Sequence, residues 1–230
     1  MHFGVAVFPG SNCDADTYNA LKYLGHQVSY LWHAEDELPA VDCVVLPGGF
    51  SYGDYLRPGA IARFAKVMEQ VTDFANKGGL VLGICNGFQV LTEAGLLPGS
   101  LQRNDNLQFR CQWQWLRVEG RDNMFTRHLD GELLHLPIAH GDGSYYLPPD
   151  ELKGLEARGG VVFRYCDEAG NVSSAANPNG AVANVAAVTN AEGNVLGMMP
   201  HPERAVEKIL GGTDGQRLFA AIVRGWEARQ

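Results

Sequence analysis

Three short, almost continuous apolar runs are the feature that most constrains the fold of this 230-residue chain. Runs of this kind are typical of strands buried on both faces, as in a parallel sheet. Each run is followed at once by a turn rich in Gly or Pro, which ends the strand. The runs cover residues 3–8, 43–46 and 80–85, and the turns begin at Pro9, Pro47 and Asn86.

Segments with the 3.6-residue period of an amphipathic helix lie between and after these runs. The strongest predicts a helix over 61–77, with one apolar face made by Ile61, Phe64, Ala65, Met68, Val71, Phe74 and Ala75. Strands that alternate with helices across short connections indicate right-handed βαβ units. Further helices are expected over 14–24, 88–94 and 214–229, the last with Asp214 as its N-cap.

The second half of the chain predicts strands of another kind. Over 109–115, apolar and polar residues alternate with the two-residue period of a strand that has one wetter face. A further strand is expected at 160–165, and 183–189 and 194–199 flank a hairpin turn. The sequence therefore predicts an α/β fold of three layers: a mostly parallel open sheet with flanking helices and an added antiparallel portion, in one domain over 1–230.

The charge balance and the cysteines argue against several classes of function. With a formal net charge of −8 and only 18 Lys plus Arg, the chain is a poor general binder of nucleic acid or anionic membrane. No apolar stretch reaches the roughly 18 residues of a membrane span, and no signal peptide is expected. The five Cys are scattered, which argues against a disulfide framework and indicates a reducing cytoplasm. Neither CxxC nor HExxH spacing is present, so no metal site is expected.

The segment from Gly83 to Gly87 has the pattern G-x-C-x-G, in which a buried strand ends at Cys85 and a helix follows. This is the thiol form of a nucleophile elbow. A strained apex brings the residues two positions to either side close together, so only small residues fit there. The helix N-terminus then favours the thiolate of Cys85 as a nucleophile. The alternative is a packing turn with a small core cysteine.

A thiolate nucleophile needs a proton shuttle, and His201 is the best candidate among the seven His. It follows a predicted strand, is flanked by prolines, and has Glu203 two residues on to orient its ring as the third member of a triad. The alternative is a surface turn. His140, in a Gly-rich segment, is the competitor and is expected to lie at the edge of the site or to contact a partner.

A third motif, Pro47-Gly48-Gly49-Phe50, follows the second apolar run. Such a pair of glycines lets the backbone approach a substrate closely, and backbone N–H groups there can stabilise an oxyanion. We expect the donors to come from around Gly49 and from the N–H of Asn86. A tight turn without a ligand is the alternative.

Together, these motifs resemble the class I, triad-type glutamine amidotransferases, which have a flavodoxin-like fold. The resemblance implies that Cys85, His201 and Glu203 form the catalytic triad. It also implies that the oxyanion hole and the glutamine site include Gly48, Gly49, Phe50, Asn86 and Gln89. The segment 103–111 is similar to the one that lines the glutamine pocket in this family, which places Phe109 and Arg110 there.

A finer resemblance is to the glutaminase subunits of phosphoribosylformylglycinamidine synthases, carried by residues 8–14, 47–57, 83–89 and 137–141. It implies that ammonia from L-glutamine passes to a separate synthetase subunit, which uses ATP and Mg²⁺ to convert formylglycinamide ribonucleotide to its amidine in purine synthesis. A small third subunit bridges the two. This chain has no P-loop motif, so no cofactor is expected in it.

Three other functions remain open from the sequence. The same glutaminase chemistry could serve another synthetase, the elbow could belong to a DJ-1-like thiol protein, or the chain could be a binding module with a relic triad. If the resemblance holds, the isolated chain is expected to be sluggish until a partner orders the oxyanion loop. The tyrosines and prolines of 145–149 are a candidate docking patch or a plain surface turn.

Overall fold

The computed structural model describes residues 1–121 and 123–229. The strands are β1 (His2–Val7), β2 (Gln27–Trp32), β3 (Cys43–Leu46), β4 (Leu80–Ile84), β5 (Ser100–Gln102), β6 (Arg110–Val118), β7 (Leu133–His140), β8 (Ser144–Tyr146), β9 (Val161–Cys166), β10 (Val185–Thr189) and β11 (Val195–Met198). The α-helices are α1 (Asp14–Tyr23), α2 (Lys66–Asn76), α3 (Asn86–Glu93), α4 (Pro149–Ala157) and α5 (Asp214–Glu227). Single 3₁₀ turns are η1 (Ser51–Asp54), η2 (Ala62–Phe64), η3 (Ser174–Ala176), η4 (Val182–Asn184), η5 (Pro202–Arg204) and η6 (Lys208–Leu210).

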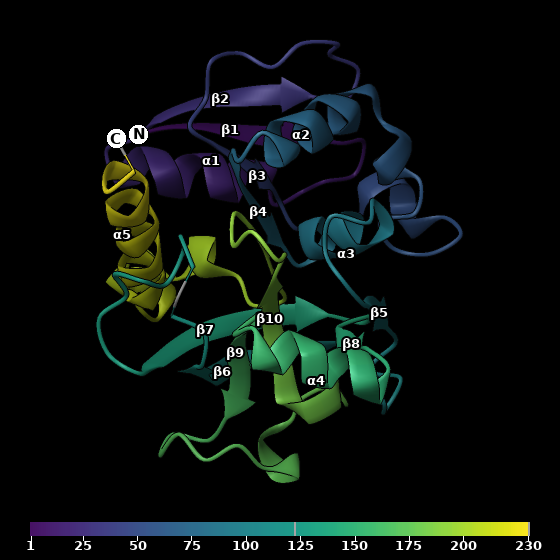
Figure 1. Cartoon of the computed structure of the whole chain (residues 1–230), viewed down its shortest axis with the longest axis vertical. Helices are drawn as coiled ribbons and strands as arrows, with labels where there is room; N and C mark the ends of the chain where they lie inside the picture. The colour runs from purple at the N-terminus through teal and green to yellow at the C-terminus, as the bar shows by residue number, and fades with distance from the viewer. Residues whose placement is uncertain (122, 230) are drawn as a thin grey trace.

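One nine-stranded sheet runs through the molecule in the order β2-β1-β3-β4-β11-β10-β9-β6-β7. Strands β2, β1, β3, β4 and β11 pair in parallel and occupy the upper part of Figure 1. From β11 onward every pairing is antiparallel, and these strands occupy the lower part. Strands β5 and β8 form a separate two-stranded sheet. The α/β fold predicted from the sequence is confirmed, and its antiparallel portion is as wide as its parallel portion.

The parallel part forms where the three apolar runs predicted it. Every residue of β3 and β4 is buried, as is the centre of β1, because helices cover the sheet. The chain order reverses beside β1, which has β2 on one side and β3 on the other. In open α/β sheets ligands bind at such a switch point, outside the carboxyl ends of the strands. The turns after β1, β3 and β4 all lie at these ends.

Some helix boundaries differ from those predicted. Helix α2 begins at Lys66, because Ala65 is extended (φ −64°, ψ 143°) and separates it from η2. Phe64 therefore leaves the predicted apolar face and is 73% exposed, with the Arg63 guanidinium over its ring. Helix α3 begins at Asn86, two residues earlier than predicted.

The predicted cap of α5 was also wrong. Thr213 is its N-cap, and the carboxylate of Asp214 instead accepts a hydrogen bond from the backbone N–H of His135 in β7 (2.7 Å). Arg217 of the same helix donates to the carbonyl of Leu133 (3.1 Å). Helix α5 thus covers the outer edge of β7, the last strand of the sheet.

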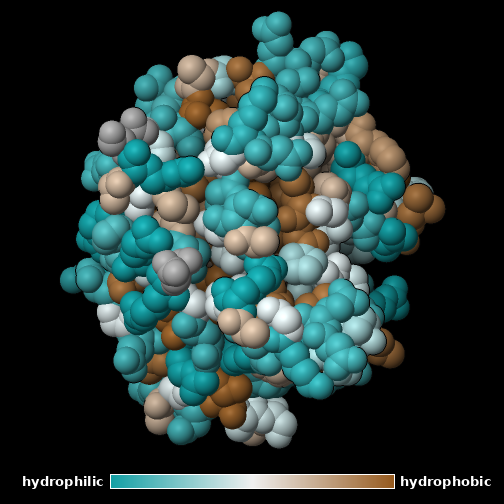
Figure 2. Space-filling model, viewed as in Figure 1, coloured by the Kyte–Doolittle hydropathy of each residue, from teal (hydrophilic) through white to brown (hydrophobic). Residues whose placement is uncertain are grey.

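The predicted docking patch at 145–149 is not a surface feature as a whole. Tyr145 is 1% exposed, stacks on Phe88 and donates its hydroxyl hydrogen bond to the carbonyl of Pro98. Pro149 begins α4. Tyr146, Pro148 and Pro149 are exposed, so part of the patch does reach the surface. Leu56 is more exposed, at 89%, and hydrophobic residues stand out at the right of the molecule in Figure 2. In the described residues, no helix is long and apolar enough to cross a membrane.

Candidate active site

Cys85 lies at the apex of the turn between β4 and α3 in a conformation that L-residues rarely adopt (φ 50°, ψ −103°). A Cβ on Gly83 would lie 2.7 Å from the carbonyl oxygen of Gly87, and a Cβ on Gly87 would lie 2.0 Å from that of Leu46. Both glycines are therefore required by close backbone approach, as the sequence predicted. The first N–H groups of α3 lie beside the sulfur, where a helix N-terminus stabilises negative charge.

His201 and Glu203 form a buried pair directly after β11. The imidazole Nδ1 is 2.6 Å from Glu203 Oε1, and the two residues are 1% and 2% exposed. Burial alone lowers the pKa of His201, but the charges of Glu203 and Cys85 outweigh it and hold that pKa well above its ordinary value. His201 therefore carries a proton at neutral pH. Its backbone N–H donates to the carbonyl of Pro137 in β7 (2.8 Å), which anchors the base to the sheet.

The nucleophile candidate and the imidazole meet at Gly48. A Cβ on Gly48 would lie 2.7 Å from His201 Cε1 and 3.4 Å from Cys85 Cβ, so both side chains pack against this glycine. The Cys85 sulfur lies 3.7 Å from the carbonyl oxygen of Ala139. His201 Nε2 is buried and makes no hydrogen bond of good geometry among the described residues, although the ring interacts with the Cys85 sulfur. It is the ring atom that a substrate can engage.

A second thiol, Cys13, lies close to the same groups. Its sulfur lies within 4.8 Å of ligand atoms of His201 and Glu203, a spacing that could hold a metal ion. However, the Arg204 guanidinium donates to Cys13 Sγ (3.1 Å) and places a positive charge there. Burial raises the pKa of the Cys13 thiol to about 12, so this sulfur is protonated and weakly nucleophilic. The expectation that no metal is bound stays a prediction.

The predicted oxyanion loop follows β3. Gly49 has φ 125°, and a Cβ there would lie 2.6 Å from the backbone nitrogen of Asn12. The Phe50 N–H donates to the carbonyl of Gly10 (3.0 Å), so in this conformation Phe50 offers no free donor. The N–H of Gly49 has no acceptor in the described part of the chain, and that of Asn86 lies in the unpaired first turn of α3.

A cavity of about 400 Å³ opens beside Cys85. Of the predicted site residues, Gly48, Asn86, Glu203 and Arg110 do not line it. Arg110 is excluded because strand alternation turns it away from the face that carries Cys111. Several residues that the sequence reasoning did not propose for the site do line it, among them Cys13, Asp54, Asp142 and Arg204. The predicted residues that line the cavity are Gly49, Phe50, Cys85, Gln89, Phe109, His140 and His201.

Gln89 is buried in the cavity wall, and each end of its amide makes a hydrogen bond within the chain. Its Nε2 donates to the backbone carbonyl of Asp142 (2.7 Å), and its Oε1 accepts from Asn86 Nδ2 (2.9 Å). The carbonyl oxygen of the Asn86 side chain accepts from the backbone N–H of Ser51 (3.1 Å). Gln89 thus ties α3 to the segment after β7 and the loop after β3, and its amide keeps a second N–H and a second oxygen lone pair with which it can contact substrate.

His140 is part of the wall, as expected for a residue at the edge of the site. Its ring lies 3.2 Å from Asn104 Oδ1, and the Asn104 amide donates to the carbonyls of Gln108 and His140. Burial and, second, the charge of His201 lower the pKa of His140 to about 4, so it is neutral at neutral pH. This network holds the 104–108 segment against β7.

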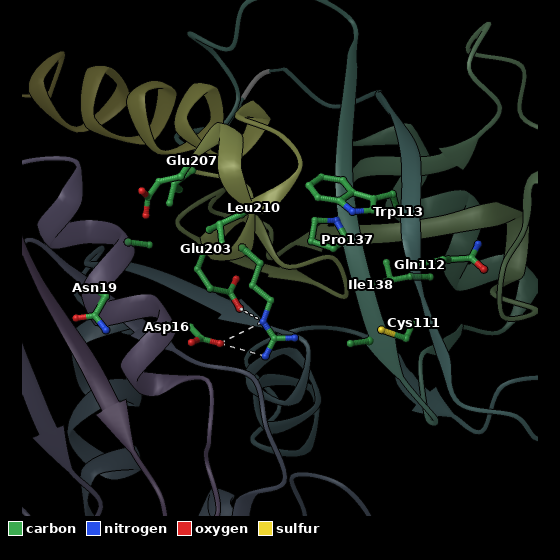
Figure 3. Close-up of a pocket in the computed structure, with 14 residues that line it drawn as sticks. Asp16, Asn19, Cys111, Gln112, Trp113, Pro137, Ile138, Glu203, Glu207 and Leu210 are labelled. Carbon is green, nitrogen blue, oxygen red and sulfur yellow. Dashed lines mark hydrogen bonds and ion pairs between the residues drawn. The ribbon is translucent and has the colours of Figure 1, made fainter.

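A larger cavity, of about 560 Å³, adjoins the first. Figure 3 shows it between Asp16 on α1, Leu210 after η5, and Trp113 and Pro137 on β6 and β7. Glu203 lines this second cavity, whereas Cys85 and His201 line the first. Arg204 lines both, and it is held between them by Asp16 (3.1 Å, dashed in Figure 3).

The fold is that of a glutamine amidotransferase. A model of the CobB/CobQ-like glutamine amidotransferase domain matches residues 1–216, and the chain belongs to this family. The chain is 60% identical to the phosphoribosylformylglycinamidine synthase subunit PurQ of Moorella thermoacetica over 99% of this chain and 97% of that protein. It is 55% identical to the phosphoribosylformylglycinamidine synthase subunit PurQ of Aquifex aeolicus over 97% of this chain and 99% of that protein.

Solved structures agree with this assignment. The structure of PurLQS from Thermotoga maritima includes a chain that is 44% identical, with a TM-score of 0.86 and 97% of each chain covered. A glutamine amidotransferase of Thermotoga maritima, 19% identical with a TM-score of 0.57 and covering 100% of this chain and 85% of that chain, shares the fold. The family resemblance read from the motifs is confirmed.

Proposed function

We propose that this chain is the glutaminase subunit of phosphoribosylformylglycinamidine synthase. The high identity to PurQ subunits along nearly their whole length supports this function over the alternatives of another amidotransferase or a DJ-1-like thiol protein. L-glutamine is the substrate, and the partners are the synthetase subunit and a small third subunit. ATP and Mg²⁺ act on the synthetase, and this chain, one domain over 1–230, works in the cytoplasm without a cofactor of its own.

The observation that most supports this chemistry is the strained turn at Cys85 beside the His201–Glu203 pair. Cys85 attacks the side-chain amide of glutamine, and the N–H groups of Gly49 and Asn86 stabilise the oxyanion. His201 gives its proton to the departing ammonia and then activates water, which hydrolyses the glutamyl thioester. Glu203 fixes the orientation of the ring through the 2.6 Å contact to Nδ1.

The oxyanion loop also supports a dependence on the partner. The backbone N–H of Phe50, next to Gly49, donates to the carbonyl of Gly10 and is not directed to the cavity. If docking of the synthetase broke this hydrogen bond and freed the N–H of Phe50 for the oxyanion, the rate of glutamine hydrolysis would rise. We therefore expect slow glutamate release by the isolated chain and faster release in the complex with its substrates present.

The test is glutamate release by the complex with Cys85→Ala, compared with Cys13→Ala. Loss of Cys85 should abolish glutamine-dependent synthesis, while synthesis from added ammonia continues on the synthetase. Because the Cys13 thiol is protonated, Cys13→Ala should retain activity of the same order as the wild type. Glu203→Gln should reduce kcat by about 10²- to 10⁴-fold with a small change in KM. Normal glutaminase activity in Cys85→Ala would refute the mechanism.

A further inference from the structure

We infer that the carboxylates of Asp54 and Asp142 bind the α-ammonium group of the substrate, and so restrict the site to free amino acids that carry a side-chain amide. The inference rests on the proposed function and assigns the end of the substrate that does not react. Asp54 ends η1, in the loop after β3, and Asp142 follows β7, so two distant segments each bring one carboxylate to the cavity that contains Cys85.

Both residues are tied to the helix that follows the nucleophile. Asp54 Oδ1 lies 3.4 Å from the side-chain nitrogen of Asn86, the residue after Cys85. The backbone carbonyl of Asp142 accepts the 2.7 Å hydrogen bond from Gln89, one turn further along α3. The Asn86–Gln89 amide contact thus links the Asp54 side chain to the backbone of Asp142 across the cavity wall.

The two carboxylates have little compensating positive charge. Burial raises the pKa of Asp54 to about 6, and the nearby negative charge of Asp142 adds to that rise. Asp142 has one distant cation, Arg103, at 4.0 Å and largely exposed. Arg204, which also lines the cavity, is held by Asp16 at 3.1 Å. An ammonium group between the two carboxylates would remove the repulsion and form charge-assisted hydrogen bonds.

The loop that carries Asp54 is strained. Tyr52, Asp54 and Leu56 all have positive φ (54°, 54° and 68°), a region that non-glycine residues rarely occupy. The strain is held by the Tyr52 N–H bond to the carbonyl of Pro9 (2.6 Å) and the Ser51 N–H bond to Asn86. Strain of this kind persists where the surrounding structure fixes a functional group in place, here the Asp54 carboxylate.

The same cavity is built to receive a polar ligand at another point. His201 lines it, and its buried ring interacts with Cys85, which also lines it. A glutamine molecule has a carboxamide at one end and an ammonium group at the other. With the carboxamide at Cys85 and His201, the ammonium can reach the acidic pair, which offers the only two carboxylates among the lining residues described.

The experiment compares two substrates with the assembled synthase. Ammonia release is measured from L-glutamine and from glutaramate, which keeps the carboxamide and carboxylate but lacks the α-ammonium group. The variants are Asp54→Asn, Asp142→Asn and the double variant, with Asp36→Asn, an exposed carboxylate outside the cavity, as matched control. Asn is isosteric and tolerates the positive φ at position 54. Thermal denaturation checks the folding of each protein.

We expect each single variant to lower kcat/KM for glutamine by about 10- to 100-fold, mainly through KM, and to leave kcat/KM for glutaramate within about twofold. In the double variant, kcat/KM for glutamine should then fall close to kcat/KM for glutaramate. A parallel loss for both substrates would mean a structural role and would overturn the inference, as would an unchanged kcat/KM for glutamine. If the wild-type synthase releases ammonia from neither substrate, the proposed function itself fails and the inference falls with it.

Discussion

The parallel and antiparallel halves of the sheet are stabilised in different ways. The parallel half depends on fully buried apolar strands and on glycines where backbones nearly touch, as at Gly83 and Gly87. The antiparallel half has buried side-chain amides that donate to backbone carbonyls: Gln114 to Cys166 and Ala176, Asn179 to Gly143, and Asn184 to Tyr165 and Ser173. Apolar packing places Cys85, whereas polar networks shape the cavity wall that faces it.

The largest effect that would test this contrast is expected at Gly87. In Gly87→Ala the new Cβ would lie 2.0 Å from the carbonyl oxygen of Leu46, a backbone atom that cannot move aside cheaply. We expect a loss of more than about 4 kcal/mol in the free energy of unfolding, or no soluble protein. Urea denaturation followed by circular dichroism measures it. A midpoint near that of the wild type would show that the parallel half is less tightly packed than described.

A smaller, pH-dependent effect is expected in the antiparallel half at His140. Its pKa is about 4 in the folded protein and near the ordinary 6.5 in the unfolded chain, so the unfolded chain binds more protons between these values. This contribution to stability is complete above about pH 6.5 and is lost as the pH falls towards 4, by up to about 3 kcal/mol.

The matched variant for this prediction is His140→Gln, which removes the titrating group but keeps a polar side chain. Its stability should fall less steeply than that of the wild type between pH 6.5 and pH 4. The measurement is the free energy of unfolding at a series of pH values for both proteins. Equal slopes would mean that burial and the charge of His201 do not hold His140 neutral in the folded protein.

The smallest effect has the opposite sign. Gly154 lies inside α4, which packs beside the antiparallel strands, and a Cβ there would meet open space among the described residues. Gly154→Ala should raise the free energy of unfolding by about 0.5–1 kcal/mol, because Ala costs less entropy than Gly in a helix. The same denaturation assay detects it. If Gly154→Ala instead lowered the free energy of unfolding, Gly154 would be as tightly packed as Gly87, and the contrast between the two positions would fail.

The difference between the parallel and antiparallel halves of the sheet also explains which elements could be predicted from the sequence. Continuous apolar runs predicted β1, β3 and β4 to within a residue or two, and the spacing around Cys85 and His201 predicted groups that the structure brings together. Strands β2, β5, β7 and β8 were missed. Pro137 interrupts the pattern of β7 and is tolerated because this is an edge strand. Asp54 and Asp142 lie in loops, and nothing in their spacing indicated that folding would bring them to one cavity.

The cover over the outer edge of β7 has a consequence for aggregation. An exposed strand edge invites pairing with another chain, but here the N–H of His135, the carbonyl of Leu133 and the carbonyl of Pro137 are already occupied. Two of these three contacts come from α5, and Pro137 has no N–H to offer. A chain cut before Asp214 would therefore expose a strand able to pair with its neighbours and would tend to self-associate even if the rest of the sheet folded.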